Sequence, residues 1–379
     1  MFTIDIRDKN HNKIFGFIPL YLSFSENYDG TGNATIGVQS YFKDEINNKV
    51  VYNEKISKIK DEDMNRVFIY FQKKNQSEKK TVFIGFIFQN RVFSKNNELT
   101  CFGIRRYMQE KTIIEEIDYN NIKIGSIINN EWTKIKNDYS TNINIQTVDM
   151  NDIVTDQKFL EGSAFDSLLS IAVDYGYSLR LESNVDIKNF PLTLNIGKNI
   201  GRYLSIDNGT EKAIILKFND NDSDSANIIL PESILIDSTQ VANSVVIKSN
   251  TQTIKYSEVE VGAEKRTAFI NDYLTNGDSI LDRAKNYVKT HKNPVKKISI
   301  SPKQNAFLPG AIRAGDTIRL QIKHKNKSFE FDNIFKILTV SVERGSAYIN
   351  SIEIGDSLEY SELMKIKKDV AFLKNSQGL

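Results

Sequence analysis

Short apolar runs alternate with turn-forming segments along the first quarter of the chain. From Ile14 to about Asn96 the runs are rich in Phe, Ile, Val and Tyr, and polar stretches such as DGTGN (29–33) and KKNQSEKK (73–80) interrupt them. Aromatic and β-branched residues in short, broken runs are typical of strands. The segment ELTCFG (98–103) ends this series, and IRRYMQEKTI (104–113) loses the alternation and predicts a short helix. We therefore expect a β-barrel or sandwich in this part of the chain.

Two longer amphipathic helices are predicted further along. In SAFDSLLSIAVDYG (163–176), Ser163 is the expected N-cap, Gly176 is the expected C-cap, and apolar residues recur at helical spacing between them. The segment SILDRAKNYVKTH (279–291) places its apolar residues on one face and ends ahead of Pro294. Strands are expected at YSLRLES (177–183), PLTLNIG (191–197), KAIILKF (212–218) and NSVVIKS (243–249). This mixture predicts α/β inserts after the first β-domain.

The last part of the chain returns to strands and then to a helical spacing. KKISISP (296–302), AGDTIRLQIKHK (314–325), NIFKILTVSV (333–342) and YINSIEIG (348–355) each contain a short β run near turn-forming residues. Beyond them, Leu363, Ile366, Val370 and Leu373 are spaced by three, four and three residues. Two heptads are too few to hold a coiled coil alone, so this helix needs partners that are already close.

The predicted fold class is α+β and predominantly β, with two β-barrel domains, α/β inserts and a short C-terminal helix. A chain of 379 residues exceeds the roughly 250–300 at which single cores usually divide. We expect an N-terminal barrel at 1–125, an α/β insert at 126–200, a second β-rich insert with a helix at 201–292, a C-terminal barrel at 293–356 that can also pair with strands from 201–250, and a helix at 357–379.

Composition and charge exclude several classes of function. The formal net charge of +2 does not indicate a surface that grips a nucleic acid duplex. Cys101 is the single cysteine, which excludes an internal disulfide and a cysteine-based zinc site, and its strand context predicts a small buried apolar residue. The longest apolar run, Val82–Phe88, is far shorter than the roughly 20 residues of a membrane span, so none is expected.

Catalytic and metal-binding patterns are weak. His11, His291 and His324 lie in a polar turn, at a helix end and in a lysine-rich segment, and none accompanies a catalytic motif, so we expect solvated side chains. Neither glycine-rich phosphate motif is present, and no cofactor is expected.

One acidic segment resembles the start of a calcium loop. Asp220, Asp222 and Asp224 match the first three ligand positions of an EF-hand loop, but Ser225 replaces its glycine and Pro231 its closing glutamate. An acidic connection between strands is the preferred interpretation, with calcium as the alternative.

Two further groups of residues offer alternatives to a structural role. Glu115, Glu116 and Asp118 permit a paired-carboxylate glycosidase hypothesis, although exposed charges at a helix end are the preferred interpretation. Trp132 and the sixteen tyrosines permit a sugar-stacking platform, although aromatic residues in β-rich domains more often belong to the core.

The segment IDSTQVANSVVIKSN (236–250) combines small polar residues with a strand. Asp237, with the serine and threonine that come after it, can bond to nearby backbone groups and form a local turn. Asn243 can do the same at the strand entrance. We expect these residues to fix where Val245 and Ile247 enter the core.

The order of several motifs resembles bacteriophage tail hub proteins, the tail-associated family of siphophages that is similar to the myophage baseplate hub. The segment 81–113 resembles their theme of a strand with a glycine (Gly85), a returning strand, an L-x-C-x-G strand (Gly103) and a short helix. The segment 236–250 resembles their D-x-S-x-x-A-N-x-V-x-V strand, with Asp237 and Asn243. LPGAIRAGDTIRLQI (308–322) resembles their closing barrel, in which a Gly-Asp turn, here Gly315 and Asp316, begins a strand.

The resemblance implies a non-enzymatic structural protein of the virion, made in the bacterial host cytoplasm. It implies a homotrimer that closes the tail tube, joins the tube to the distal tail protein and to a tail fibre or spike, contacts the tape measure protein, and opens for passage of phage DNA. Leu363, Ile366, Val370 and Leu373 would then form a threefold plug or a joint to the next protein. The alternatives are a tail-tip cell-wall hydrolase, with Glu115 and Glu116, and a receptor- or glycan-binding module, with Trp132.

Overall fold

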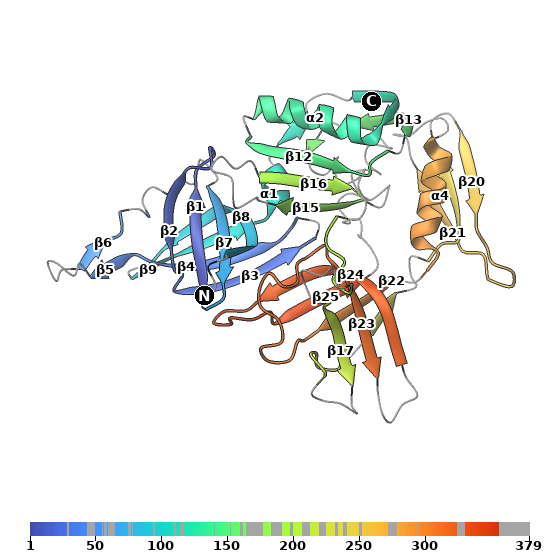
Figure 1. Cartoon of the computed structure of the whole chain (residues 1–379). Helices are drawn as coiled ribbons and strands as arrows, with labels where there is room; N and C mark the ends of the chain where they lie inside the picture. Colours follow the sequence, from blue (N-terminus) through green and yellow to red (C-terminus); the bar gives the residue numbers. More distant parts are fainter. Residues whose placement is uncertain are drawn as a thin grey trace.

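The computed structural model describes most of the chain, and strands predominate in the described part (Figure 1). The fold is therefore mainly β with few helices, as the sequence predicts. The described part omits residues 29, 44–49, 55, 57–58, 60–64, 75–76, 78, 94, 110, 114–116, 140, 152, 160–161, 164–176, 183–191, 198–199, 207–212, 220–224, 232–233, 238–240, 250–251, 272–278, 294, 324–329 and 356–379.

One large sheet passes through both the N-terminal and the C-terminal β regions (Figure 1). Hydrogen-bonded neighbours follow the order β18 (Ile234–Asp237), β22 (Val295–Ile300), β25 (Ser351–Gly355), β24 (Glu330–Val342), β3 (Tyr21–Asn27), β4 (Asn33–Gln39), β9 (Asn96–Phe102), β8 (Lys79–Val92), β7 (Arg66–Gln72), β1 (Phe2–Arg7) and β2 (Lys13–Phe17), while β23 (Thr317–Lys323) joins β24 and β17 (Ile215–Asn219) joins β23.

The pairing of β24 with β3 unites the two regions. Antiparallel partners such as Thr339 with Asn27 and Val342 with Phe24 continue the C-terminal strands into the N-terminal ones. Among the described residues this pairing order does not close on itself, so the arrangement as two barrels stays a prediction.

The main hydrophobic core draws on both regions. Alternate residues of β1 and β4 are buried, including Ile4 and Ile36, and so are Ile318 and Leu320 of β23. This period of two is the reason that the strands could be recognised in the sequence. Cys101 lies in the same core, and burial raises the pKa of its thiol, which confirms the prediction of an inert apolar cysteine.

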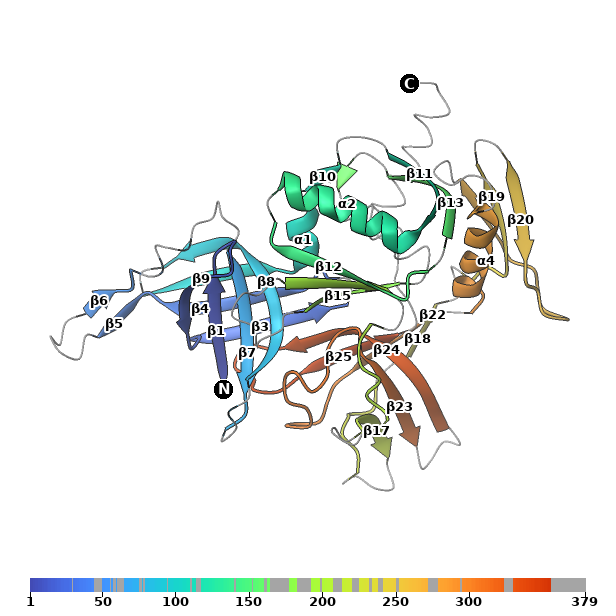
Figure 2. The same ribbon diagram turned by 45° about the horizontal axis from the view of Figure 1, so that its top comes forward.

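A second layer consists of a helix on a small sheet (Figure 2). The helix α2 (Ile124–Asp138) packs on β12 (Ile143–Val148), which is parallel to β16 (Leu192–Gly197), and β16 is antiparallel to β15 (Ser178–Glu182). The sequence analysis missed α2, although its buried residues Ile124, Ile127, Ile128 and Ile135 have helical spacing.

Short elements surround this layer. The helix predicted at 104–113 is confirmed only over Ile104–Gln109, as α1, because Thr112–Ile113 form a strand. The helix predicted at 163–176 lies outside the described residues apart from Ser163, which belongs to a strand. The elements are α1 (Ile104–Gln109), the pair β10 (Thr112–Ile113) and β14 (Gly162–Ser163), the pair β11 (Ile117–Lys123) and β13 (Ile153–Phe159), and the hairpin β5 (Tyr41–Lys43) and β6 (Val50–Tyr52).

A third unit has its own core. The strands β20 (Thr253–Ser257), β19 (Ser244–Lys248) and β21 (Thr267–Asn271) lie in that order, and α4 (Ser279–His291) packs on one face. Val245 and Ile247 of β19 are fully buried against α4, which confirms that they enter a core. The predicted helix at 279–291 is also confirmed. None of the described helices is both long and apolar enough to span a membrane.

Candidate functional site

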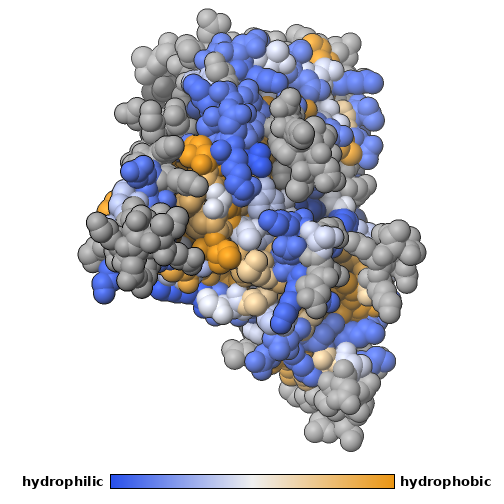
Figure 3. Space-filling model, turned by 60° about the vertical axis from the view of Figure 1, so that its left-hand side comes forward, coloured by the Kyte–Doolittle hydropathy of each residue, from blue (hydrophilic) through white to orange (hydrophobic). Residues whose placement is uncertain are grey.

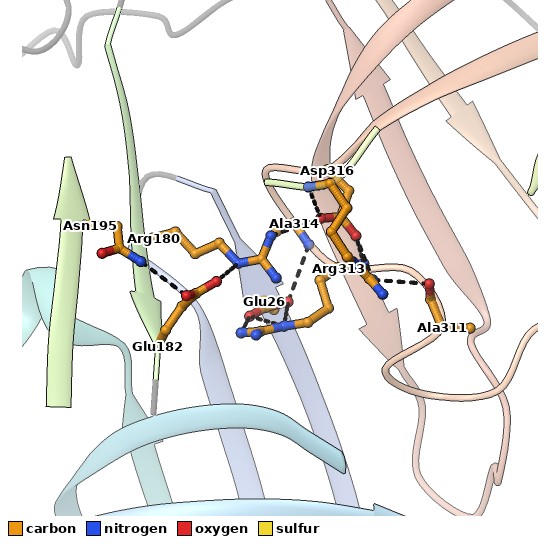
Figure 4. Close-up of polar contacts among 9 residues, drawn as sticks. Glu26, Arg180, Glu182, Asn195, Ala311, Arg313, Ala314 and Asp316 are labelled. Atoms are coloured by element: carbon orange, nitrogen blue, oxygen red, sulfur yellow. Dashed lines mark hydrogen bonds and ion pairs between the residues drawn. The ribbon is translucent and has the colours of Figure 1, made fainter. Parts of the chain in front are cut away.

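Charged side chains meet at a junction of three parts of the chain (Figure 4). Glu26 comes from the end of β3, Arg180 and Glu182 come from β15, and Asp316 comes from the loop that leads into β23. We call this cluster, together with Arg202 and Arg313, the junction. It is one of the places where the large sheet contacts the layer that contains α2, and a hydrophobic core shared by both is another.

Asp316 is the centre of the junction. Its carboxylate is fully buried and lies 2.7 Å from Nη1 of Arg180 and 2.7 Å from Nη2 of Arg202. It also accepts hydrogen bonds from the backbone N–H groups of Arg202 and Arg313, at 2.9 and 3.1 Å. Burial by itself raises the pKa of the Asp316 carboxyl, but Arg180 and Arg202 outweigh burial and hold the pKa below its ordinary value. The carboxylate therefore stays ionised.

Arg313 joins the same loop to β3. Its Nε lies 3.2 Å and its Nη2 2.5 Å from Oε1 of Glu26, and the N–H of Ala314 donates to Oε2 of Glu26 at 3.2 Å. Burial lowers the pKa of Arg313, but the Glu26 carboxylate more than compensates and holds the pKa above its ordinary value. The pair therefore fixes the loop to the N-terminal strands.

Glu182 completes the junction on the side of the small sheet. Its Oε1 lies 3.0 Å from Nε of Arg180, and its Oε2 accepts a hydrogen bond from Asn195 of β16 at 3.0 Å. Each carboxylate of the junction thus faces at least one guanidinium group. A charge-balanced, largely buried cluster of this kind holds its elements in one geometry, because every group that leaves it loses its partners.

The backbone at the junction requires glycine. Gly315 has φ +87° and Gly201 has φ +110°, conformations that other residues rarely adopt. A Cβ added to Gly201 would collide with the carbonyl oxygen of Gly315. The two loops can therefore approach closely enough for Arg202 and Thr317 to share a backbone hydrogen bond of 2.8 Å.

A small cavity borders the junction. It measures about 30 Å³, and its lining includes Glu26, Tyr28, Gly103, Arg180 and Leu181. That volume admits water, whereas pockets for organic ligands measure about 300–1,000 Å³. In the part of the chain that the structure describes, no three His, Cys, Asp or Glu residues are grouped to hold a metal ion. The geometry of the junction is suited to joining structural units.

Comparison with known proteins identifies the fold. No family profile matches the chain, and no curated protein matches its sequence. A tail protein from Neisseria meningitidis superposes with a TM-score of 0.55 at 10% identity, over 94% of this chain and 97% of that one. A prophage tail protein from Listeria monocytogenes gives 0.54 at 12% identity, over 99% and 100%. The chain has the fold of phage tail proteins.

A third structure extends this likeness to a prophage named MuSo2. The 43 kDa tail protein of that prophage, from Shewanella oneidensis, has a TM-score of 0.53 at 10% identity, and the match covers 93% of this chain and 97% of that one. The phage tail protein fold therefore extends over nearly the whole length of all three matched chains. The suspected resemblance to phage tail hub proteins is supported at the level of the fold.

Of the glycines and the aspartate singled out in this part of the sequence, Gly103, Gly315 and Asp316 lie at or beside the junction. Gly103 precedes α1 and lines the cavity, and a Cβ on it would collide with the carbonyl oxygen of Gly30. A Cβ on Gly85 of β8 would approach the ring of Phe83 to 2.5 Å. Gly315 and Asp316 belong to the junction itself. The structure thus brings three of these four residues together around one contact.

Asn243 and Asp237 lie elsewhere in the tail protein fold. Asn243 precedes β19, and its side chain bonds to the backbone of Glu264 and Arg266, more than twenty residues ahead, and not to a local turn. Asp237 ends β18, where its backbone faces Val295. The predicted local role of Asn243 is therefore replaced by a longer-range one.

Two expectations for polar residues were wrong, whereas the preferred interpretation of Trp132 as a core residue is confirmed. Trp132 is 2% exposed, and its Nε1 donates to the carbonyl of Ile143 at 2.8 Å, so it belongs to the core and offers no platform for a sugar. His11 is buried and not solvated, because the loop that carries it is packed beside Asn142. Asp118 lies in β11 and not at a helix end.

Other candidates fall outside the described residues. They are Glu115 and Glu116, the possible calcium ligands Asp220, Asp222 and Asp224, and the C-terminal helix residues Leu363, Ile366, Val370 and Leu373.

The sequence analysis did not identify Glu26, Arg180, Arg202 or Arg313 as site residues. One usable signal was Arg180, a long charged residue between two leucines of a short strand. Its partner Asp316 is 136 residues away, and sequence spacing carries no information about such a pair.

Proposed function

We propose that this protein is a structural component of a phage tail tip, namely a homotrimeric hub that closes the tail tube. The observation that carries the proposal is the likeness to three tail proteins over more than nine tenths of every chain compared. The junction agrees with such a role, because a protein that transmits force between a tube and a tip benefits from fixed contacts between its parts.

The proposed partners are those expected for that position in the virion. They are the tail tube protein and the distal tail protein on one side, a tail fibre or spike on the other, and the tape measure protein within, with transient passage of phage DNA when the hub opens. The protein would be made in the host cytoplasm and then incorporated into the tail. Two barrels per chain, at 1–125 and 293–356, would give six around a threefold ring, with inserts at 126–200 and 201–292.

The proposed role is non-enzymatic, in keeping with neighbours that are named as tail proteins. Zymography of the purified protein on Gram-positive cell walls is expected to give no clearing. Clearing that disappears in Glu115→Gln and Glu116→Gln variants would instead establish the hydrolase.

The decisive experiment measures mass and shape together. Light scattering coupled to size-exclusion chromatography is expected to give three chains per particle, and electron microscopy of purified protein and of virions is expected to show a ring at the tail tip. A stable monomer at micromolar concentration that does not assemble on tail tube or distal tail protein would contradict the proposal.

A further inference from the structure

A projecting loop connects β20 to β21, and we call residues 258–266 the arm. All nine of its residues are exposed. Its outer end is a tight turn in which the N–H of Ala263 donates to the carbonyl of Glu260 at 3.0 Å, with Gly262 at φ +84°. Val261 in this turn is completely exposed. In Figures 1 and 2 the arm extends away from the rest of the molecule beyond β20.

Asn243 holds both ends of the arm. Its backbone carbonyl accepts from the N–H of Glu258 at 2.8 Å, and its backbone N–H donates to the carbonyl of Arg266 at 3.1 Å. Its side-chain amide donates to the carbonyl of Glu264 and accepts from the N–H of Arg266, both at 2.8 Å. One residue therefore fixes the two legs of the arm, which lowers the entropy that a partner must overcome on binding.

The arm combines exposed apolar residues with acidic ones. Val259 and Val261 alternate with Glu258 and Glu260, which is the pattern of a strand with one covered face, yet both valines are exposed. Glu264 lies on the other side of the turn. Phe269 of β21, at 80% exposure, adds a large apolar side chain near the returning leg. The outer part of the arm, residues 258–264, thus presents apolar contacts flanked by three carboxylates, while Lys265 and Arg266 follow where the returning leg approaches β21.

A complementary surface lies at the hairpin of β8 and β9, and we call Tyr41, Tyr52, Arg91, Val92, Phe93 and Lys95 the aromatic tip. The N–H of Ser40 donates to the carbonyl of Lys95 at 3.3 Å, which places β5 beside the hairpin, and the rings of Tyr41 and Tyr52 are 5.4 Å apart. Val92 and Phe93 are 69% and 49% exposed.

The aromatic tip carries the charge opposite to that of the arm. Arg91 and Lys95 flank its apolar residues and are both exposed, and Arg91 also lies 3.9 Å from the carboxylate of Glu98 on the same hairpin. Figure 3 turns the side of the molecule with β5 and β6 toward the viewer, and apolar surface is visible there among hydrophilic residues. The tip therefore offers apolar contacts beside two cations, which suits the acidic outer part of the arm, residues 258–264.

The two surfaces lie at opposite ends of the molecule. Figures 1 and 2 both place the hairpin of β5 and β6 at one end and the arm at the other. Complementary patches at opposite ends cannot meet within one chain, but they can meet between copies in a head-to-tail contact, which forms a ring where the rotation closes.

We propose that the arm of one copy binds the aromatic tip of the next copy of this chain. The inference rests on the proposed homotrimer and supplies it with a contact between neighbouring subunits. Val261 and Val259 pack against Phe93 and Val92, and Glu260 and Glu264 lie against Arg91 and Lys95.

Cysteine cross-linking tests the contact in the full-length protein. Val261→Cys and Phe93→Cys are prepared as separate variants, and buried Cys101 serves as an unreactive background. Under mild oxidation, each variant alone is expected to stay uncross-linked, an equimolar mixture is expected to give covalent dimers, and the double variant is expected to give closed covalent oligomers. Self-cross-linking of Val261→Cys would overturn the head-to-tail arrangement.

A charge reversal gives an independent test. Glu260→Lys combined with Glu264→Lys is expected to shift the dissociation of the oligomer to about tenfold higher protein concentration, a change of about 1.4 kcal/mol. Adding Arg91→Glu and Lys95→Glu is expected to restore association. Asp282→Lys on the exposed side of α4 is the matched control and is expected to leave association unchanged.

The outcomes separate this inference from the proposed function. A wild-type trimer with no cross-link in the mixture, and with no effect of the charge reversal, would overturn the contact and leave the hub proposal standing. A wild type that is monomeric and fails to join tails would overturn both. Binding of the arm to purified tail tube or distal tail protein, in place of the tip, would show that another tail component occupies it and would overturn the self-contact.

Discussion

Asp316 illustrates how one buried carboxylate can organise distant segments. It binds two guanidinium groups and two backbone N–H groups, and its own backbone carbonyl accepts from the N–H of Ile337 at 2.8 Å. A buried carboxylate is tolerated when its lone pairs are occupied in this way, and removal of its charge takes away the counter-charge that Arg180 and Arg202 share. Substitution of Asp316 should therefore lower the free energy of unfolding.

Replacement of Asp316 by Asn is expected to lower the free energy of unfolding by about 3–5 kcal/mol, because Arg180 and Arg202 lose their buried counter-charge. Chemical denaturation measures the change. The matched control is Asp332→Asn, which removes an exposed ion pair with Arg319 and should cost only about 0–1 kcal/mol. Equal effects of the two substitutions would show that the junction contributes no special stability.

Substitution of Gly315 tests whether the same loop requires a left-handed backbone conformation. Gly315→Val is expected to lower the free energy of unfolding by more than about 1 kcal/mol, because φ +87° is disfavoured for a β-branched residue. Gly315→Asn should be better tolerated, since asparagine adopts left-handed conformations more readily and a Cβ at this position meets no atom closer than 3.8 Å. Thermal unfolding compares the variants. An unchanged midpoint in the valine variant would show that this conformation is not required.

His11 is buried among cations. Its Nε2 lies 3.3 Å from the carbonyl of Asn142, and the charges near it are Arg7, Asp8 and Arg66. Arg66 is itself buried, with one hydrogen bond to the carbonyl of Asp8 and its guanidinium near the ring of Phe86. Burial first, and Arg66 second, lower the pKa of His11 below its ordinary value of 6.5.

This lowered pKa predicts a loss of stability in mild acid. As the pH falls below about 6.5, the unfolded chain takes up a proton on His11 before the folded chain does, so unfolding becomes more favourable until the folded pKa is reached. His11→Asn should remove that dependence, because asparagine accepts the observed φ of +64°. Midpoints of urea unfolding between pH 7.5 and 5 compare the two proteins. Asp316 affects stability in a different pH range. Its pKa is lowered, so its contribution is lost only as the pH falls below 3.8, the ordinary pKa of an aspartate.

Among the elements, β24 has the largest share in holding the sheet together. It pairs with β23, β25 and β3, so one long strand links the C-terminal strands to the N-terminal ones. Its neighbour β25 is held on its other side by β22. All of these pairings are formed by residues up to and including Gly355, the last residue of β25.

Truncation after Gly355 is therefore expected to preserve both the fold and the proposed trimer. The spacing of apolar residues at 363–373 offers only two heptads, which contribute too little to hold three chains together. Particle mass by light scattering, compared with that of the full chain at equal concentration, tests this expectation. If truncated chains are monomeric, the C-terminal segment has a larger part in assembly.

At the scale of the whole molecule, the junction should couple the layer that contains α2 to the large sheet. Trp132 is the single tryptophan of the chain and is buried in the core between that layer and strands β7 and β8, so its fluorescence reports on the packing of the layer. Circular dichroism reports mainly on the strands. The two signals are expected to change at the same denaturant concentration in the wild type and to separate in Asp316→Asn. Separate transitions already in the wild type would indicate independent units.

Many of the strands and helices could be predicted from the sequence, because they depend on the local periodicity of apolar residues. The alternation in TIRLQIK predicts β23, and the helical spacing of Ile280, Ala284 and Val288 predicts α4. The apolar residues of α2 also have helical spacing, but this helix was not predicted, because the buried polar residue Glu131 interrupts its apolar face. The burial of Cys101 also agrees with its strand context.

The sequence by itself determined which stretches become strands and helices, because side-chain periodicity and turn chemistry act between residues a few positions apart. Only the tertiary structure decided the junction, the burial of His11, the hydrogen bond from Trp132 to the carbonyl of Ile143, and the contacts of Asn243 with the arm. Those contacts join residues from about ten to nearly three hundred positions apart, as for Arg313 and Glu26, and their energies depend on how whole elements are placed against one another.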